Sequence, residues 1–264
     1  AIDHASGKYL FFMDSDDEIT EDAIEKLYRA MQETPVDVTA GSVEKRERNG
    51  NVRMRRIYPD ETVAGMLAMG YKHYSSRNRE TVVWNKLYLL SFLKKHNIKC
   101  IDNQLYEDAV FTCQVVLNAS SYKYIPDITY IHYDTDNSGM DRVRTKRVSL
   151  RASKEYLEII NFTKKYLDHY TDMRLRELVF RSLIFTIVLS VALVSDSVLL
   201  SRKEKRYFCR QCLVFPVSLA EAKRFEHRRF FLFMYVMFHL PLKTLFCKTV
   251  HSIGSRRKRN VAAS

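Results

Sequence analysis

The sequence lacks the features that mark secreted or membrane-spanning proteins. Its five cysteines, at positions 100, 113, 209, 212 and 247, do not have the spacing of a disulfide framework. The chain does not open on a signal-peptide pattern. The uncharged runs 182–195 and 230–242 hold 14 and 13 residues, fewer than the roughly 20 that a spanning helix needs. We therefore expect a globular protein of a reducing, cytoplasmic compartment.

Net charge is also absent from most of the chain. From residue 201 onward there are 15 Lys and Arg against 3 Asp and Glu, whereas the preceding residues carry 28 of each sign. This asymmetry suggests an anionic partner for the C-terminal region. A nucleic acid is disfavoured because the basic residues flank the aromatic and aliphatic run 230–238 and form no recognisable binding motif.

The basic C-terminal region instead predicts a contact with a membrane. Its apolar run is too short to span a bilayer, but its basic flanks suit a surface of anionic head groups. We expect residues from about 201 onward to hold the protein peripherally at the inner face of the cell membrane. The alternative is that this helix packs on the rest of the protein and that the tail is a disordered basic end.

Acidic residues follow directly after an apolar run near the start of the chain. Residues 9–13 have the length of a buried strand, and Asp14, Asp16 and Asp17 come next. A strand that presents acids at its carboxyl end and leads into a helix is typical of ligand sites in open α/β sheets. Asp14 and Asp16 could share Mg²⁺ or Mn²⁺, which prefer oxygen ligands, and Asp17 need not join them. The alternative is a simple turn in which one Asp caps the next helix.

The remaining pattern predicts an α/β part followed by a helical part. Thr20 is expected to cap a helix, Asn49-Gly50 to close a two-residue hairpin, and 61–69 to form a short helix. Two short strands, 122–125 and 128–133, are expected on either side of Pro126. Beyond residue 140 the apolar spacing is helical, which predicts two domains, 1–140 and 141–264.

Four residues between the strands are candidates for substrate or catalytic roles. The only tryptophan, Trp84, stands two residues before Lys86, and sugar rings commonly stack on an indole; core packing is the alternative. Glu107 and Asp108 open a predicted helix, where acids usually complement the macrodipole. They could equally provide a general base at a helix N-terminus.

These pieces together resemble a known family in their order and spacing. The resemblance covers about residues 1 to 140, and its motifs are Ala5-x-Gly7-x-Tyr9-x-x-Phe12-x-Asp14-Ser15-Asp16-Asp17, Trp84-Asn85-Lys86-Leu87-Tyr88, Tyr106-Glu107-Asp108-x-x-Phe111 and Asn137-Ser138. The chain is similar to bacterial family-2 inverting glycosyltransferases of the glycosyltransferase A fold. The resemblance implies a partial doubly wound α/β sheet with a helical C-terminal region. It also implies that Asp14 and Asp16 contact the nucleotide and its divalent metal, and that Asp108, beside Glu107, is the catalytic base.

The implied activity is that of a hexosyltransferase-like enzyme. It would transfer a sugar from a nucleotide-sugar donor to an acceptor hydroxyl with inversion, in the synthesis of a bacterial surface polysaccharide or a lipid-linked glycan. Family members normally begin with an apolar strand that ends in a Pro-x-Tyr-Asn turn, and this strand does not precede Ala1. We therefore expect the N-terminal nucleotide-binding portion to be missing. The alternative is a truncated, non-catalytic membrane-associated or scaffold protein derived from such an enzyme.

Overall fold

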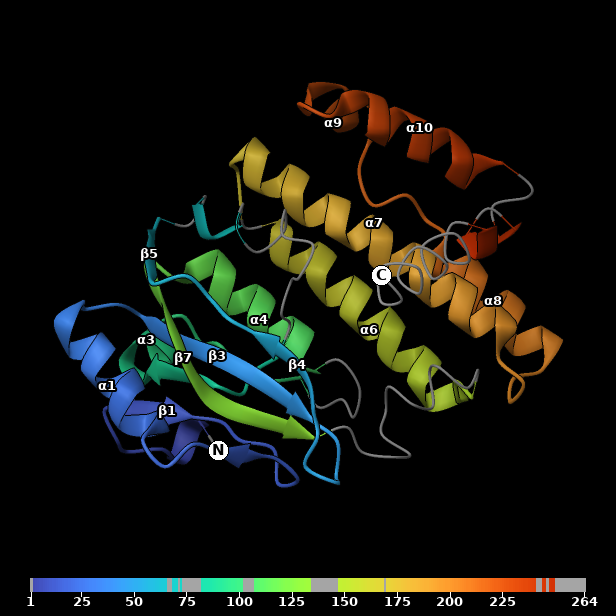
Figure 1. Cartoon of the computed structure of the whole chain (residues 1–264). Helices are drawn as coiled ribbons and strands as arrows, with labels where there is room; N and C mark the ends of the chain where they lie inside the picture. Colours follow the sequence, from blue (N-terminus) through green and yellow to red (C-terminus); the bar gives the residue numbers. More distant parts are fainter. Residues whose placement is uncertain are drawn as a thin grey trace. The chain divides into compact units, whose positions relative to one another are not determined.

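The computed structural model divides the chain into two compact units (Figure 1). The first comprises Ala1–Asp102 and Glu107–Asp136, and the second comprises Asn103–Tyr106 and Asn137–Ser264. The residues that the structure describes are 2–65, 68–70, 72, 82–101, 107–133, 147–168, 170–240, 244–245 and 247–249. Tyr106, Asn137 and Ser138 of the sequence motifs lie outside these ranges, as does the basic cluster 256–259.

A seven-stranded mixed sheet forms the centre of the first unit. Its strands are β1 (Tyr9–Phe11), β2 (Glu18–Ile19), β3 (Val38–Arg46), β4 (Val52–Arg56), β5 (Glu61–Ala64), β6 (Lys86–Leu89) and β7 (Ser121–Tyr133). The order is β1-β6-β3-β7-β2, with β4 paired to β3 and β5 paired to β7. Among the described pairs, β3 with β7 is parallel and the others are antiparallel.

Helices cover both faces of this sheet, which explains why β1 is apolar throughout. The helices are η1 (Ile2–His4), α1 (Ala23–Glu33), α3 (Leu90–Lys95) and α4 (Glu107–Asn118). Tyr9 and Phe11 pack in the cluster that contains the inner face of α1, whereas Leu10 and Phe12 pack in the cluster that contains α3 and α4. Successive strand residues point to opposite faces, so a strand covered on both sides is apolar at every position.

The predicted helix at 61–69 and the predicted two-residue hairpin at Asn49-Gly50 are both wrong. The predicted helix 61–69 begins instead as strand β5, because Val63 is buried opposite Tyr122 of β7. The hairpin after β3 has a longer loop than predicted: the Glu47 N–H donates to the Asn51 carbonyl, and Gly50 alone in the loop has a positive φ. A two-residue type I′ turn would need positive φ at both central positions.

A group of buried hydrogen bonds around Asn85 holds β3, β6 and β7 together at the point where the pairing of β3 with β7 shifts register. The two predicted strands around Pro126 are one continuous strand, β7, whose pairing with β3 shifts register between Ala40 and Val43. At that point the Asn85 amide donates to the carbonyl of Gly41 at 2.6 Å and accepts from the Thr129 hydroxyl at 2.6 Å. Asn85 holds a left-handed conformation, with φ of 58°. These hydrogen bonds fix the backbone at Asn85, and therefore the positions of its neighbours Trp84 and Lys86.

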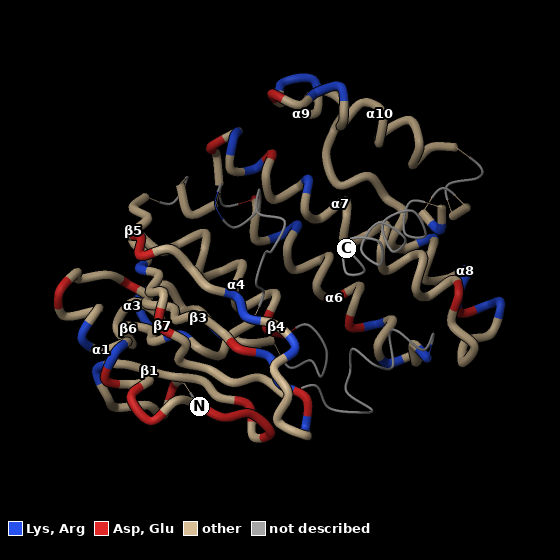
Figure 2. Tube along the Cα trace, viewed as in Figure 1, with Lys and Arg blue, Asp and Glu red and all other residues tan. Residues whose placement is uncertain are grey.

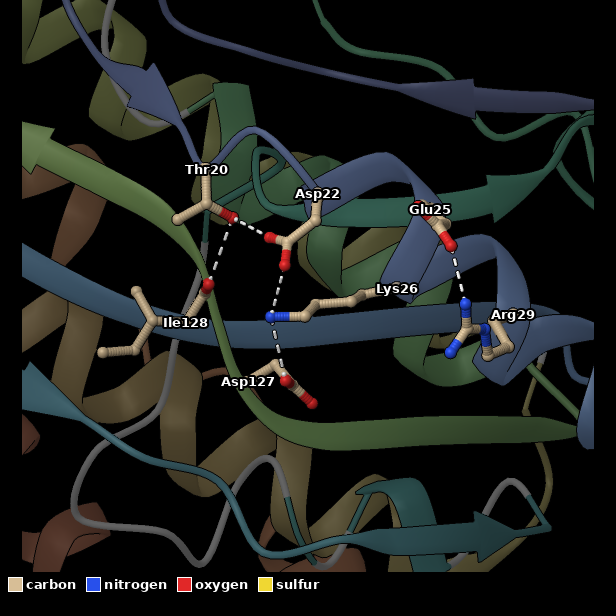
Figure 3. A network of polar contacts seen from close by, with 7 residues as sticks. All are labelled: Thr20, Asp22, Glu25, Lys26, Arg29, Asp127 and Ile128. Carbon is tan, nitrogen blue, oxygen red and sulfur yellow. Dashed lines mark hydrogen bonds and ion pairs between the residues drawn. The ribbon is translucent and has the colours of Figure 1, made fainter.

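A polar network joins the start of α1 to β7 (Figure 3). Lys26 lies 2.8 Å from Asp22 and 3.1 Å from Asp127, and the Thr20 hydroxyl donates to the Ile128 carbonyl at 3.2 Å. The predicted cap at Thr20 is wrong, because Asp22 occupies the N-cap position. Thr20 instead uses its hydroxyl to attach the loop to β7.

The second unit is helical, as the sequence pattern predicts. It contains α6 (Leu150–Leu167), α7 (Met173–Asp196), α8 (Arg202–Cys212), α9 (Leu219–Arg224) and α10 (Arg228–His239). By length and composition α7 is the one helix among the described residues that could cross a membrane, and 67% of its most apolar stretch is buried inside the protein. The apolar run of α10 is also partly core: Phe231, Met234 and Phe238 are buried, while Phe233 and Val236 are each 55% exposed.

The start of α10 is attached to α7 by a buried carboxylate. Glu177 accepts hydrogen bonds from the backbone N–H groups of Glu226 and His227, at 2.7 and 3.0 Å. Nδ1 of His227 lies 2.6 Å from the same carboxylate. One residue earlier on α7, Arg176 pairs with Glu221 of α9 at 2.8 Å. The buried carboxylate of Glu177 is therefore satisfied by hydrogen bonds from the segment that it holds in place, the start of α10.

Candidate active site

Acidic residues, red in Figure 2, recur along the segment between β1 and α1. Asp14, Asp16 and Asp17 each offer an oxygen within 4.8 Å of the others. Asp14 and Asp16 are exposed, whereas Asp17 is 6% exposed. Burial and the neighbouring charges of Asp17 and Asp16 raise the pKa of Asp14. A cation between these groups would relieve that repulsion, so the donor set fits a hard divalent ion.

Asp17 anchors this loop to β7. Its carboxylate accepts the Tyr133 N–H at 2.9 Å and lies 3.0 Å from Nδ1 of His132. Burial by itself would raise the pKa of Asp17, but the hydrogen bonds with His132, Tyr133 and Tyr130 outweigh it and hold the pKa below its usual value. The Asp14 N–H donates to the Tyr130 hydroxyl at 3.0 Å. The three acids therefore divide into an anchor, Asp17, and two outward carboxylates.

Trp84 belongs to the support of that anchor. Its indole is 8% exposed and stacks on the ring of Tyr130, with centroids 4.4 Å apart, and on that of His132 at 5.4 Å. The predicted role of Trp84 in stacking on a sugar stays a prediction. Tyr130 and His132 also belong to the site, although they are not among the residues predicted from the sequence. Their spacing of two in an aromatic strand was the available signal, because it puts both rings on one face.

Lys86 is a buried cation on β6. Its ammonium donates to the carbonyls of Val82 and Trp84, at 2.8 and 3.2 Å. Its charge also acts on Asp108, whose pKa it lowers. The structure thus brings Lys86 close to the predicted base, and a direct contact with substrate stays a prediction.

Glu107 and Asp108 open α4 as predicted. Burial, followed by the charge of Glu107, raises the pKa of Asp108 from 3.8 to about 7, against the lowering effects of the Ala109 N–H and of Lys86. Asp14 adds a further raising effect, which shows that the charges of the two acidic groups interact. A carboxyl group with a pKa near 7 is suited to accept a proton from a hydroxyl at neutral pH.

An aromatic cluster brings the two acidic groups together. Phe12 is two residues before Asp14, and Phe111 is three residues after Asp108, on the same side of α4. Their rings meet edge to face with centroids 5.6 Å apart, and Tyr88 contacts both, at 5.8 and 5.5 Å. Such pairs contribute about 0.5–1.5 kcal/mol beyond the burial of their area. The packing therefore fixes the end of β1 against the start of α4.

The arrangement separates two chemical tasks. Asp14 and Asp16 offer paired, exposed carboxylates that could hold a metal-bound diphosphate. Asp108 offers a carboxyl group whose environment favours proton transfer at neutral pH. Reactions that move a group from a phosphate-bearing donor to a hydroxyl need both tasks.

Comparison with known proteins gives a family match for residues 1–112 and a likeness in fold. Residues 1–112 match the family model described as glycosyl transferase family 2. The solved structure of S. aureus TarS 1-349 in complex with UDP-GlcNAc aligns with a TM-score of 0.60 at 15% identity, over 96% of this chain and 70% of that one. This likeness confirms the predicted fold class, a glycosyltransferase A-like mixed sheet with a helical C-terminal region.

Two curated relatives are named as glycosyltransferases. The chain is 28% identical to the uncharacterized glycosyltransferase YibD of Escherichia coli K12 over 179 residues, which cover 65% of this chain and 51% of that protein. It is 22% identical to the cholesterol galactosyltransferase of Borreliella burgdorferi over 169 residues, which cover 60% of this chain and 47% of that protein. The chain spans about half the length of the curated relatives it matches.

Proposed function

Because residues 1–112 match the model of glycosyl transferase family 2, we propose that the protein transfers a sugar from a nucleotide-sugar donor to an acceptor hydroxyl. The single observation that carries the proposal is the pairing of an outward carboxylate pair, Asp14 and Asp16, with a carboxyl group of pKa about 7, Asp108. The family match supports the transferase class, and the chemistry of these groups supports their roles.

Asp108 is the proposed general base. Its carboxylate takes the proton of the acceptor hydroxyl as that oxygen bonds to the anomeric carbon and the bond to the departing diphosphate breaks. A base on the face opposite the leaving group gives inversion at the anomeric carbon. Lys86 keeps part of Asp108 ionised at neutral pH because its cation offsets the burial and the charge of Glu107.

Asp14 and Asp16 are the proposed ligands of Mg²⁺ or Mn²⁺ on the donor diphosphate. When bound, this ion would supply positive charge next to the departing diphosphate. Asp17 is not needed as a ligand, because its oxygens already accept hydrogen bonds from β7. Its proposed task is to hold the turn so that the two outward carboxylates face one position.

The proposed donor is supported by the names of a solved neighbour and of a relative. The solved complex of TarS holds UDP-GlcNAc, and one relative is named as a galactosyltransferase, which supports a hexose carried on a nucleotide. We propose an acceptor in a bacterial surface polysaccharide or a lipid-linked glycan, and a place at the inner face of the cell membrane. A non-catalytic scaffold role, the alternative, makes opposite predictions in the following experiment.

The test compares three single variants of the chain, Asp16→Asn, Asp17→Asn and Asp108→Asn. Binding of Mn²⁺ with UDP is followed by electron paramagnetic resonance, and release of UDP from UDP-hexoses is followed with and without chelator. We expect Asp16→Asn to weaken metal and donor binding most. We expect Asp108→Asn to bind normally but turn over at least about 10²-fold more slowly.

Glu107→Gln is the matched control for Asp108→Asn because it changes the neighbouring acid on the same helical turn. Retained turnover in Asp108→Asn would remove the assignment of the base. A chain that binds neither Mn²⁺ with UDP nor any UDP-hexose would support the scaffold alternative.

A further inference from the structure

The turn between α7 and α8 exposes two adjacent apolar side chains. Val198 is 72% exposed and Leu199 is 52% exposed. The turn is held in place by the buried Ser197, whose hydroxyl donates to the Val148 carbonyl at 2.6 Å and accepts the Leu199 N–H at 3.2 Å. Val198 and Leu199 are thus presented to the outside on an anchored turn, where water contact is unfavourable.

Basic residues, blue in Figure 2, recur along the adjoining helix α8, and we call the exposed row that they form the basic stripe. Arg202, Arg206 and Arg210 follow one another at intervals of four on the exposed face of α8. Lys203 and Tyr207 are exposed beside them, and the Tyr207 side chain is 62% exposed. Like charges at this spacing destabilise an isolated helix. An anionic surface would turn that repulsion into attraction.

The protein itself does not neutralise the stripe within its described part. The acid of α8, Glu204, is engaged in a capping box with Ser201 at 2.6 and 2.8 Å. No ion pair joins the stripe arginines to an acid in the residues that the structure describes. The opposite side of α8 is core, with Phe208 and Cys212 buried in the second unit. The basic face is therefore available to an external partner.

We propose that the α7–α8 surface, formed by Val198, Leu199, Arg202, Arg206, Tyr207 and Arg210, binds a bilayer that contains anionic phospholipids. The two apolar side chains would enter the acyl boundary, the tyrosine would lie at the interface, and the arginines would meet lipid phosphates. A nucleic acid could match the charge but offers no apolar phase for Val198 and Leu199. This surface identifies the residues that would contact the membrane. The proposal rests on the proposed function only for the placement of the protein at the inner face of that membrane.

Vesicle flotation tests the proposal without any sugar transfer, so its failure and that of the transferase assignment are distinguishable. The full chain is mixed with vesicles of phosphatidylcholine alone or with 30 mol% phosphatidylglycerol. We expect flotation with the anionic vesicles and little with the neutral ones. At about 1 kcal/mol for each basic residue near the surface, Arg206→Gln with Arg210→Gln should reduce the partition coefficient about 30-fold.

Two further variants separate charge from insertion. Val198→Asp with Leu199→Asp should reduce partitioning at least about tenfold, because burial of each side chain is lost. A Leu199→Trp variant should show a blue-shifted emission with anionic vesicles, against the constant background of the buried Trp84. The matched control, Lys154→Gln with Arg174→Gln, removes the same charge from exposed positions elsewhere in the second unit.

Each outcome decides for or against the surface. Partition coefficients that fall equally in the stripe variant and the control would overturn the proposal, as would an unshifted Leu199→Trp emission. Binding of a DNA duplex that displaces the vesicles, and that is insensitive to the Val198 and Leu199 changes, would assign the stripe to nucleic acid instead. Thermal melting confirms that each variant is folded.

Discussion

The ionisation of Asp108 gives the sharpest test of the site. With a pKa of about 7, Asp108 should be about half ionised at pH 7 and only about 1% ionised at pH 5. Turnover that depends on its carboxylate should fall about tenfold per pH unit below that value and level off above it. If the essential group were an exposed aspartate, turnover would begin to fall near pH 4 instead.

Neighbouring charges should move this pKa in opposite directions. Glu107→Gln removes a negative charge that raises the pKa of Asp108, so the midpoint should move to lower pH. Lys86→Met removes a cation that lowers it, so the midpoint should move to higher pH. The pair is informative because a general loss of structure would move both midpoints toward the value of an exposed carboxyl group.

The measurement is a ¹³C titration of aspartate carboxyl carbons in the labelled chain, in which Asp108→Asn identifies the resonance.

The pH dependence of stability is an independent check on this pKa. The folded pKa lies above the unfolded one, so the folded state binds more protons between about pH 4 and 7, and the free energy of unfolding decreases as pH rises through that window. At about 1.4 kcal/mol per pKa unit, this decrease in the free energy of unfolding reaches at most about 4 kcal/mol, and the decrease should be absent in Asp108→Asn.

Two results would refute this reasoning. A resonance that disappears in Asp108→Asn but titrates near pH 4 would show that burial does not control this carboxyl group. Shifts of the same sign in Glu107→Gln and Lys86→Met would show that the two charges do not act on Asp108 as the structure places them.

Three further changes test contacts that hold each unit together. Gly41→Ala would put a methyl group against the Thr129 side chain, nearest to its hydroxyl, so we expect a loss of about 1–3 kcal/mol in urea unfolding, partly restored by Thr129→Ala, which removes that hydroxyl. Asp17→Asn should lower the free energy of unfolding by about 1–3 kcal/mol, because His132 and the Tyr133 N–H lose a charged acceptor; an unchanged urea midpoint would contradict the anchor. Glu177→Ala should increase hydrogen exchange in residues 226–231, and unchanged exchange there would show that the carboxylate does not hold the start of α10.

The sequence by itself determined the features that depend on near neighbours along the chain. The apolar run 9–13 ending in acids predicts a strand that leads into an acidic loop, and Glu107 with Asp108 predicts the start of a helix. The change from mixed to helical spacing near residue 140 predicts a helical C-terminal region. Periodicity and capping are local, so a sequence records them directly.

Only the tertiary structure decided what depends on distant partners and on burial. Val63 lies in a strand because Tyr122 of β7 is opposite it, and Asp17 is an anchor because His132 lies beside it. The pKa of Asp108 follows from burial and from Glu107, Lys86 and Asp14, charges that the fold gathers from α4, from β6 and from the loop after β1. Packing likewise divides the apolar residues of the second unit into those inside and those left exposed at the α7–α8 surface. Such contacts join residues far apart in sequence, and no local pattern encodes which of them will meet.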